Sequence, residues 1–133
     1  MKIDYQKYIL LNDPVENVTE NGEIVGFTLK MGYPNYRGMY LAYTEDIVVV
    51  LDGEEFHGNR DELTLTLRSG TWKVSEFSSS GFHRWNFAEK GTIFVKKPGG
   101  IAPGKHRIEA GLLNRGYFGS RGAYVGGWRD IEM

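Results

Sequence analysis

The sequence contains no cysteine among its 133 residues. This absence excludes a disulfide framework, a thiolate metal site and a cysteine nucleophile, so packing and hydrogen bonds must hold the fold together. A strong excess of one charge is also missing, because the formal net charge at pH 7 is −1. No global field therefore draws the protein to nucleic acid or to an anionic membrane.

Long apolar runs are missing as well. The longest run, residues 47–51, is far too short to cross a bilayer, and residues 1–7 lack the apolar core of a signal peptide. A soluble, non-exported protein of the cytoplasm is therefore expected. Its length predicts a single domain, residues 1–133, built around one core.

The sequence has short strand-like segments and lacks helical patterns. No stretch of ten or more residues has the apolar period of a helix, whereas residues 27–31, 63–67 and 92–95 alternate between apolar and polar side chains. Residues 47–51 are continuously apolar and mostly β-branched, which is typical of a strand covered on both faces. These patterns predict an all-β fold, an antiparallel β-sandwich or jelly-roll-like barrel with little or no helix.

Glycine, with 18 residues, marks the turns between these strands. Asn21-Gly22 and Asp52-Gly53 favour tight hairpin turns, because these residue types tolerate positive φ. Residues 75–78 could form one helical turn. From residue 111 onward the pattern is ambiguous, and we expect either a strand pair with a long glycine-rich loop or a tail ordered by a partner.

Two segments carry the residue types of a contact surface. Residues 33–41 are the first, with the side chains Tyr33, Tyr36, Arg37 and Tyr40. Tyrosine and arginine dominate binding hot spots, although the tyrosines could equally cover the open end of the sandwich. Residues 114–128, which end in Trp128, combine arginine, glycine and aromatics as single-strand nucleic-acid binders do. The near-neutral charge argues against nucleic acid here.

Catalytic patterns are sparse. The histidines at positions 57, 83 and 106 have no recognised metal spacing and are interpreted as surface or turn residues, while a site formed by two strands stays open. Carboxylates gather near residues 47–51, at Asp46, Asp52, Glu54 and Glu55. We interpret them as solvated turn residues. The alternative is a small hydrolase that uses Asp46 and Glu54, which would have to face each other across a cleft.

An ordered set of short motifs points to a family. The set comprises Asn21-Gly22-Glu23, Gly26-Phe27, Tyr36-Arg37-Gly38, Glu45-Asp46, Val50-Leu51-Asp52-Gly53-Glu54-Glu55, Arg84-Trp85 and Lys97-Pro98-Gly99-Gly100-Ile101-Ala102-Pro103-Gly104-Lys105-His106. In this order and spacing the chain resembles the small β subunit of bacterial C-glycoside deglycosidases, from about residue 18 to about residue 108. The C-terminal part matches this pattern least.

The resemblance implies a β-sandwich subunit that pairs with a larger α subunit, a TIM barrel that carries a divalent metal, usually manganese. It implies a carbon–carbon lyase complex acting on 3-oxo-C-glycosides of aromatic aglycones such as flavonoids. The present chain would be its non-catalytic accessory subunit, with no metal or cofactor of its own.

A different class of function stays open beside the resemblance. The chain could be a free-standing carbohydrate-binding module that stacks sugars on aromatic side chains. The candidates for stacking are Tyr33, Tyr36, Trp85 and Trp128.

Overall fold

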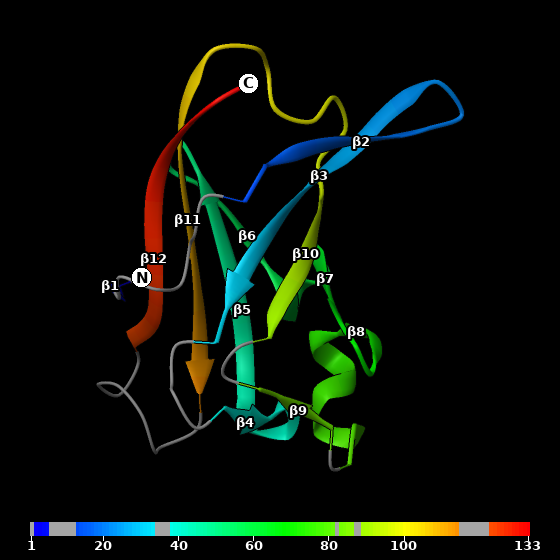
Figure 1. The fold of residues 1–133 in the computed structure, drawn as a ribbon, viewed down its shortest axis with the longest axis vertical. Helices are drawn as coiled ribbons and strands as arrows, with labels where there is room; N and C mark the ends of the chain where they lie inside the picture. The colour runs from blue at the N-terminus through cyan, green and yellow to red at the C-terminus, as the bar shows by residue number, and fades with distance from the viewer. Residues whose placement is uncertain (1, 6–12, 34–37, 82, 87–88, 115–122) are drawn as a thin grey trace.

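The computed structural model describes residues 2–5, 13–33, 38–81, 83–86, 89–114 and 123–133. Over these residues the chain forms two five-stranded sheets that face each other, with a small two-stranded sheet at one end (Figure 1). Among the described strands, each pair is antiparallel except β1 with β12, which is parallel. The prediction of an all-β antiparallel sandwich is confirmed.

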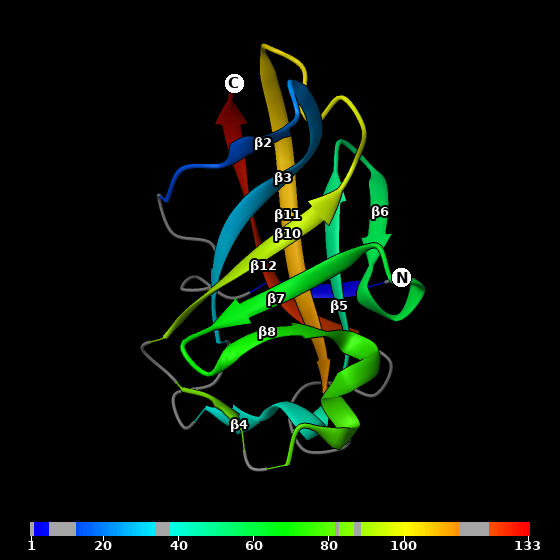
Figure 2. The ribbon, with the colours of Figure 1, turned by 90° about the vertical axis from the view of Figure 1, so that its right-hand side faces the viewer.

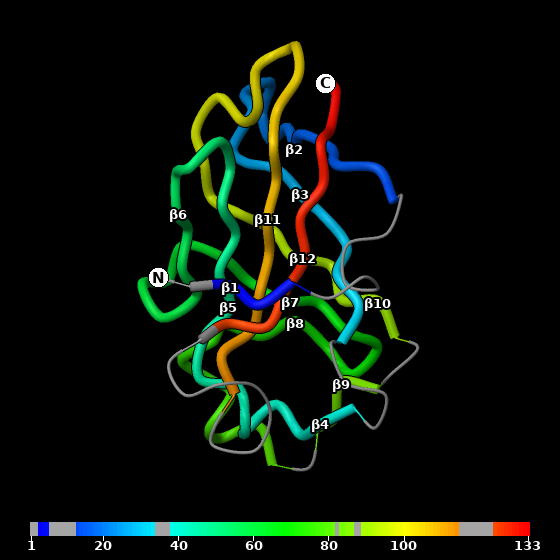
Figure 3. Tube along the Cα trace, turned by 90° about the vertical axis from the view of Figure 1, so that its left-hand side faces the viewer, coloured from blue at the N-terminus to red at the C-terminus, as the bar shows by residue number. Residues whose placement is uncertain are grey.

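The two large sheets are named here sheet 1 and sheet 2. Sheet 1 has the order β1 (Lys2–Tyr5), β12 (Ala123–Glu132), β11 (Lys105–Asn114), β5 (Thr44–Leu51) and β6 (Glu54–His57). Sheet 2 has the order β2 (Glu16–Glu20), β3 (Glu23–Gly32), β10 (Lys90–Lys96), β7 (Leu63–Leu67) and β8 (Gly70–Lys73). Figure 2 views the molecule from sheet 2, and Figure 3 views it from the opposite side, where sheet 1 lies in front.

The remaining elements are short. β4 (Met39–Tyr40) pairs with β9 (Arg84–Trp85), and the described residues also form the 3-10 helices η1 (Leu41–Tyr43), η2 (Gly58–Arg60) and η3 (Val74–Ser79). The helical turn expected at residues 75–78 therefore forms, as part of η3. Within the described ranges, no helix has the length and apolar character needed to cross a membrane.

Two turns follow directly from their sequences. Asn21 and Gly22 have φ of 51° and 81°, and Asp52 and Gly53 have φ of 49° and 88°. Both central residues at positive φ give the backbone twist that matches two paired strands, which explains why these dipeptides connect β2 to β3 and β5 to β6. The hairpin predictions at both positions are confirmed.

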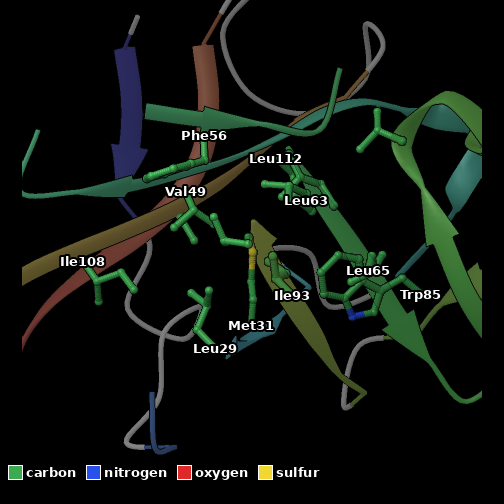
Figure 4. Close-up of a cluster of buried hydrophobic side chains, with 14 of the residues drawn as sticks. Leu29, Met31, Val49, Phe56, Leu63, Leu65, Trp85, Ile93, Ile108 and Leu112 are labelled. Atoms are coloured by element: carbon green, nitrogen blue, oxygen red, sulfur yellow. The ribbon is translucent and has the colours of Figure 1, made fainter. Parts of the chain in front are cut away.

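The core fills the space between the two sheets. Alternating residues of β3 point inward, so that Leu29 and Met31 face Val49 and Ile108 of sheet 1 (Figure 4). Burying each such side chain contributes about 1.5–3 kcal/mol, because its apolar surface leaves water. The inward-pointing side chains of β3 therefore form part of one continuous core between the sheets.

Strand β5 is covered on both faces, as its continuous apolar sequence predicted. Its inner side chains join the main core, while Val48 and Val50 on the outer face form a second buried cluster with Tyr124 of β12. Ile3 and Leu113 pack against this second cluster. The outer cover comes from β1 and the first residues of β12, two segments from opposite ends of the sequence.

The ambiguous C-terminal part forms a strand pair, which was one of the two expectations. β11 and β12 pair from Lys105 with Glu132 to Leu112 with Val125. The backbones approach closely here, since a Cβ atom on Gly126 would lie 1.9 Å from the Ala110 carbonyl oxygen. Only glycine fits at such an approach. Residues 115–122, which stand between the two strands in the sequence, lie outside the described residues.

Candidate functional site

Two of the predicted contact residues belong to the core. Trp85 has no exposed surface and Tyr33 is 3% exposed, with their ring centroids 5.4 Å apart in an edge-to-face arrangement. The indole Nε1 of Trp85 donates a hydrogen bond to the Glu89 carbonyl oxygen at 2.7 Å. A fully buried ring offers no face to a sugar or a partner, so the prediction of surface contacts at Tyr33 and Trp85 does not hold in this structure.

Tyr40 lies at the end of the sandwich marked by β4 and β9 (Figure 1). Its ring is half-buried beneath the Arg84 guanidinium, which lies 4.8 Å from the ring centroid. Tyr43 is 47% exposed, and its ring centroid lies 6.4 Å from that of Tyr40. We call Tyr40, Tyr43 and Arg84 the Tyr–Arg cluster. The other two predicted contacts in this segment, Tyr36 and Arg37, lie outside the described residues.

Trp128 lies on the outer face of sheet 1 and is 44% exposed. The Arg107 guanidinium stacks over its ring, with its central carbon 4.1 Å from the ring centroid. Arg107 also pairs with Glu109 at 3.8 Å, and Glu109 accepts a hydrogen bond from the Tyr5 hydroxyl. Of the described candidates for stacking, Trp128 therefore offers the most surface, although a guanidinium covers one face of its ring.

Hydrogen bonds among Tyr33, Asn114 and Thr44 link the two segments that the sequence marked as contact candidates. The Asn114 amide donates to the Tyr33 hydroxyl at 3.0 Å, and the Thr44 hydroxyl donates to the Asn114 side-chain oxygen at 3.1 Å. Burial raises the pKa of Tyr33 to about 12, against the lowering effect of its bonds to Asn114 and Thr44. Tyr33, which precedes residues 34–37, is thus hydrogen-bonded to Asn114, which precedes residues 115–122, although the two are 81 positions apart.

The structure also contains a largely buried ionic cluster that was not predicted from the sequence. We call Asp46, Glu55, His57 and Tyr124 the Asp46 cluster. One carboxylate oxygen of Asp46 lies 2.7 Å from His57 Nδ1 and accepts the Tyr124 hydroxyl at 2.6 Å. The other accepts the backbone N–H of Asn59 at 2.9 Å. His57 Nε2 lies 2.8 Å from Glu55 Oε1. The cluster therefore joins β5, β6, η2 and β12.

The contacts define the charge of the imidazole. An ionised carboxylate can accept a hydrogen bond but cannot donate one. A His57 ring that bonds to an ionised carboxylate at each nitrogen must therefore donate from both, which is the protonated form. Burial on its own lowers the pKa of His57, but the hydrogen bonds that the ring donates to Asp46 and Glu55, together with the charge of Asp46, outweigh it and raise that pKa. Burial and the neighbouring Asp46 also raise the pKa of Tyr124, which stays a neutral donor.

These positions correct the interpretation of Asp46 and His57 as solvated residues, because Asp46 has no exposed surface and His57 is 5% exposed. A signal for this was present in the sequence. Asp46 precedes Val48 by two positions, so it shares the face of a strand that was predicted to be covered on both sides. A carboxylate on a covered face must be buried and must find partners.

The hydrolase alternative finds no support in the arrangement of the two carboxylates. Both oxygens of Asp46 are engaged within the Asp46 cluster, while Glu54 is exposed at the start of β6 and lies 3.9 Å from Lys97 Nζ. The two therefore do not face each other across a cleft. Among the residues that the structure describes, no group of three or more His, Asp or Glu side chains could hold a metal ion.

A second histidine–carboxylate pair lies at a surface hollow of about 590 Å³. His106 Nδ1 lies 2.5 Å from Asp52 Oδ2, and His106 Nε2 lies 2.7 Å from the Ala102 carbonyl oxygen. The hydrogen bond to Asp52 is the main cause of the raised pKa of His106, and the same bond lowers the pKa of Asp52. The other residues lining the hollow are Lys105, Arg107, Asp130, Ile131 and Glu132.

The family model of the C-glycoside deglycosidase β subunit matches residues 5–117 of this sequence. The chain belongs to the C-glycoside deglycosidase β-subunit family. It is similar to a protein of Eubacterium cellulosolvens named C-glycoside deglycosidase beta subunit, with 31% identity over 92 residues. That match covers 69% of this chain and 61% of the relative, so the chain spans about three fifths of the length of the relative.

The matched region contains most of the features described above. Asp46, Glu55 and His57 fall within residues 5–117, and so does the Tyr–Arg cluster. Tyr124 and Trp128 lie beyond it. The resemblance inferred from the short motifs is confirmed. The described residues of this member of the family form an all-β sandwich.

Proposed function

We propose that this chain is the non-catalytic accessory subunit of a C-glycoside deglycosidase complex. Its partner is a larger TIM-barrel α subunit that carries a divalent metal, with manganese the expected ion. The complex cleaves the carbon–carbon bond of 3-oxo-C-glycosides of aromatic aglycones. The match of residues 5–117 to a family named as a β subunit carries this proposal, since a β subunit implies a partner.

The Tyr–Arg cluster is the surface that we assign to the partner. It combines an exposed tyrosine, a second tyrosine and an arginine stacked on it, which are the residue types that contribute most at protein interfaces. Pairing of β4 with β9 places Tyr40 opposite Arg84, so the cluster is held by backbone hydrogen bonds. A surface organised before binding loses less entropy when a partner docks.

Co-purification with a separately expressed α subunit tests both parts. The double variant Tyr43→Ala, Arg84→Ala should lose most of the complex, while Tyr5→Ala on the outer face of sheet 1 serves as the matched exposed control. Retention of the complex by the double variant would remove the cluster from the interface. Failure of the wild-type chain to bind any α subunit, or to raise its lyase activity, would overturn the accessory function itself.

One observation keeps carbohydrate binding as a second candidate. Trp128 is 44% exposed, and Arg107, which stacks on its ring, also lines the hollow of about 590 Å³. An aromatic ring beside charged and polar groups suits a sugar, whose ring stacks while its hydroxyls form hydrogen bonds. Titration of the isolated chain with glycosides should then change its tryptophan fluorescence, and Trp128→Phe should abolish the change. If the wild-type chain showed no change in fluorescence, carbohydrate binding would be excluded and the accessory function would be the remaining candidate.

A further inference from the structure

His57 has two carboxylate partners that differ in their access to water. Asp46, on Nδ1, has a side chain with no exposed surface, whereas the Glu55 side chain, on Nε2, is 39% exposed. The His57 side chain itself is 7% exposed. Water can therefore replace His57 as the partner of Glu55, but it cannot reach Asp46.

The groups that face His57 come from four elements. Asp46 of β5 and Glu55 of β6 are anionic, and Tyr124 of β12 is a neutral phenol whose ring centroid lies 6.0 Å from the imidazole. Arg60 of η2 is the cation whose charge acts against protonation of the ring. Glu62 accepts the backbone N–H of His57 at 2.6 Å, so it holds the main chain at this residue. Two carboxylates at the ring outweigh one guanidinium.

Loss of the His57 proton must break one of the two ring contacts, because a neutral imidazole has a single N–H. If Nδ1 lost its hydrogen, its lone pair would face the buried Asp46 carboxylate without water to separate them, which is costly. If Nε2 loses its hydrogen, the repelled carboxylate belongs to Glu55, which can turn into solvent. The neutral ring therefore keeps the bond to Asp46.

We propose that His57 is a proton-operated latch that holds Glu55 against strand β6 when the ring is charged and releases it to solvent when the ring is neutral. Asp46, Tyr124 and the Asn59 N–H keep their contacts in both states. Release adds a free carboxylate and one unprotonated ring nitrogen to β6, which is the terminal strand of sheet 1 in the described part of the chain. The proposal does not depend on the proposed partner.

Nuclear magnetic resonance of the full chain over a pH series tests the latch. The ring nitrogen shifts should show a charged His57 at low pH and the Nδ1–H tautomer at high pH. The Glu55 carboxyl carbon should shift at the same midpoint as His57. A neutral ring in the Nε2–H form, or a Glu55 carboxyl that ignores the His57 midpoint, would overturn the proposal.

The variant Glu55→Gln supplies a second test, since the Glu55 side chain is 39% exposed and glutamine keeps its size without its charge. It should lower the His57 midpoint, because the ring loses one anionic partner, while the His106 midpoint stays unchanged in the same spectra. An unaltered His57 midpoint would show that Glu55 does not hold the proton, and the latch would then be excluded.

Discussion

His57 and His106 have the same pattern of hydrogen-bond partners, but the carboxylates at their Nδ1 atoms differ in exposure. Each has a carboxylate at Nδ1 and an oxygen acceptor at Nε2, and each has a raised pKa. The Asp46 carboxylate at His57 Nδ1 is fully buried, whereas the Asp52 side chain at His106 Nδ1 is 49% exposed. Comparing the two sites therefore distinguishes the effect of forming a histidine–carboxylate pair from the effect of burying its carboxylate.

Burial changes what the pair does for the fold. Water and salt screen an exposed ion pair, so its loss is nearly compensated by hydration. At the buried Asp46 carboxylate, water cannot take the place of a missing partner, and the remaining charge is left in an environment of low polarity. Both pairs join separate elements, since Asp52 connects the β5–β6 turn to His106 of β11 and Asp46 connects β5 to His57 of β6. Only at Asp46 does the fold depend on the pair remaining intact, because its carboxylate is fully buried.

The largest expected effect comes from removing the buried charge. Asp46→Asn should lower the free energy of unfolding by about 3–5 kcal/mol, because a buried ion pair that loses one partner leaves the other uncompensated. Asp52→Asn should cause a much smaller loss. Urea denaturation of the two variants measures the difference, and equal losses would remove burial as the distinction between the two sites.

A smaller effect is expected from the tyrosine that supports Asp46. Tyr124→Phe removes a hydrogen bond to a buried charged group and should cost about 1.5–3 kcal/mol. Its control is Tyr5→Phe, which removes a hydroxyl bonded to Glu109 on the exposed face and should change stability by less than about 0.5 kcal/mol. Urea midpoints of the two variants measure both changes. A neutral Tyr124→Phe variant would mean that Asp46 is satisfied without the phenol.

The smallest effect is the dependence of stability on pH. Both histidines have a folded pKa above the unfolded value, so their contribution is complete below about pH 6.5 and is lost as pH rises through the folded pKa values. Asp52 acts oppositely, since its lowered pKa adds stability that is lost as pH falls through the folded value.

Urea midpoints from about pH 5 to about pH 9 measure this dependence. The wild-type chain should become less stable across the upper part of the range. His106→Gln should keep part of that decline, and the part that persists reports His57. If His106→Gln abolished the decline entirely, the buried histidine would not titrate in the folded protein.

Local rules explain which predictions of the fold succeeded. The alternation at residues 27–31 sets one inner face because successive side chains of a strand point to opposite sides. The dipeptides at 21–22 and 52–53 specify their turns through the φ values that they tolerate. Such features depend on neighbours in the sequence, so they can be read without the tertiary structure.

The site predictions had a different outcome because residue type does not define exposure. Trp85 and Trp128 are the same side chain, yet one is fully buried and the other is 44% exposed. Aromatic residues serve cores and binding surfaces alike. Which role each takes depends on the sheet face that it occupies, and the pairing of distant strands decides that face.

The sequence by itself determined the family, the β-rich architecture and its hairpins, because these rest on short motifs and on the period of two. Only the tertiary structure decided that Asp46 meets Tyr124, 78 positions away, and that Tyr33 meets Asn114. Contacts of this kind require β5, β11 and β12 to pair in one register. That register arises from the summed packing of two sheets, which no local pattern contains.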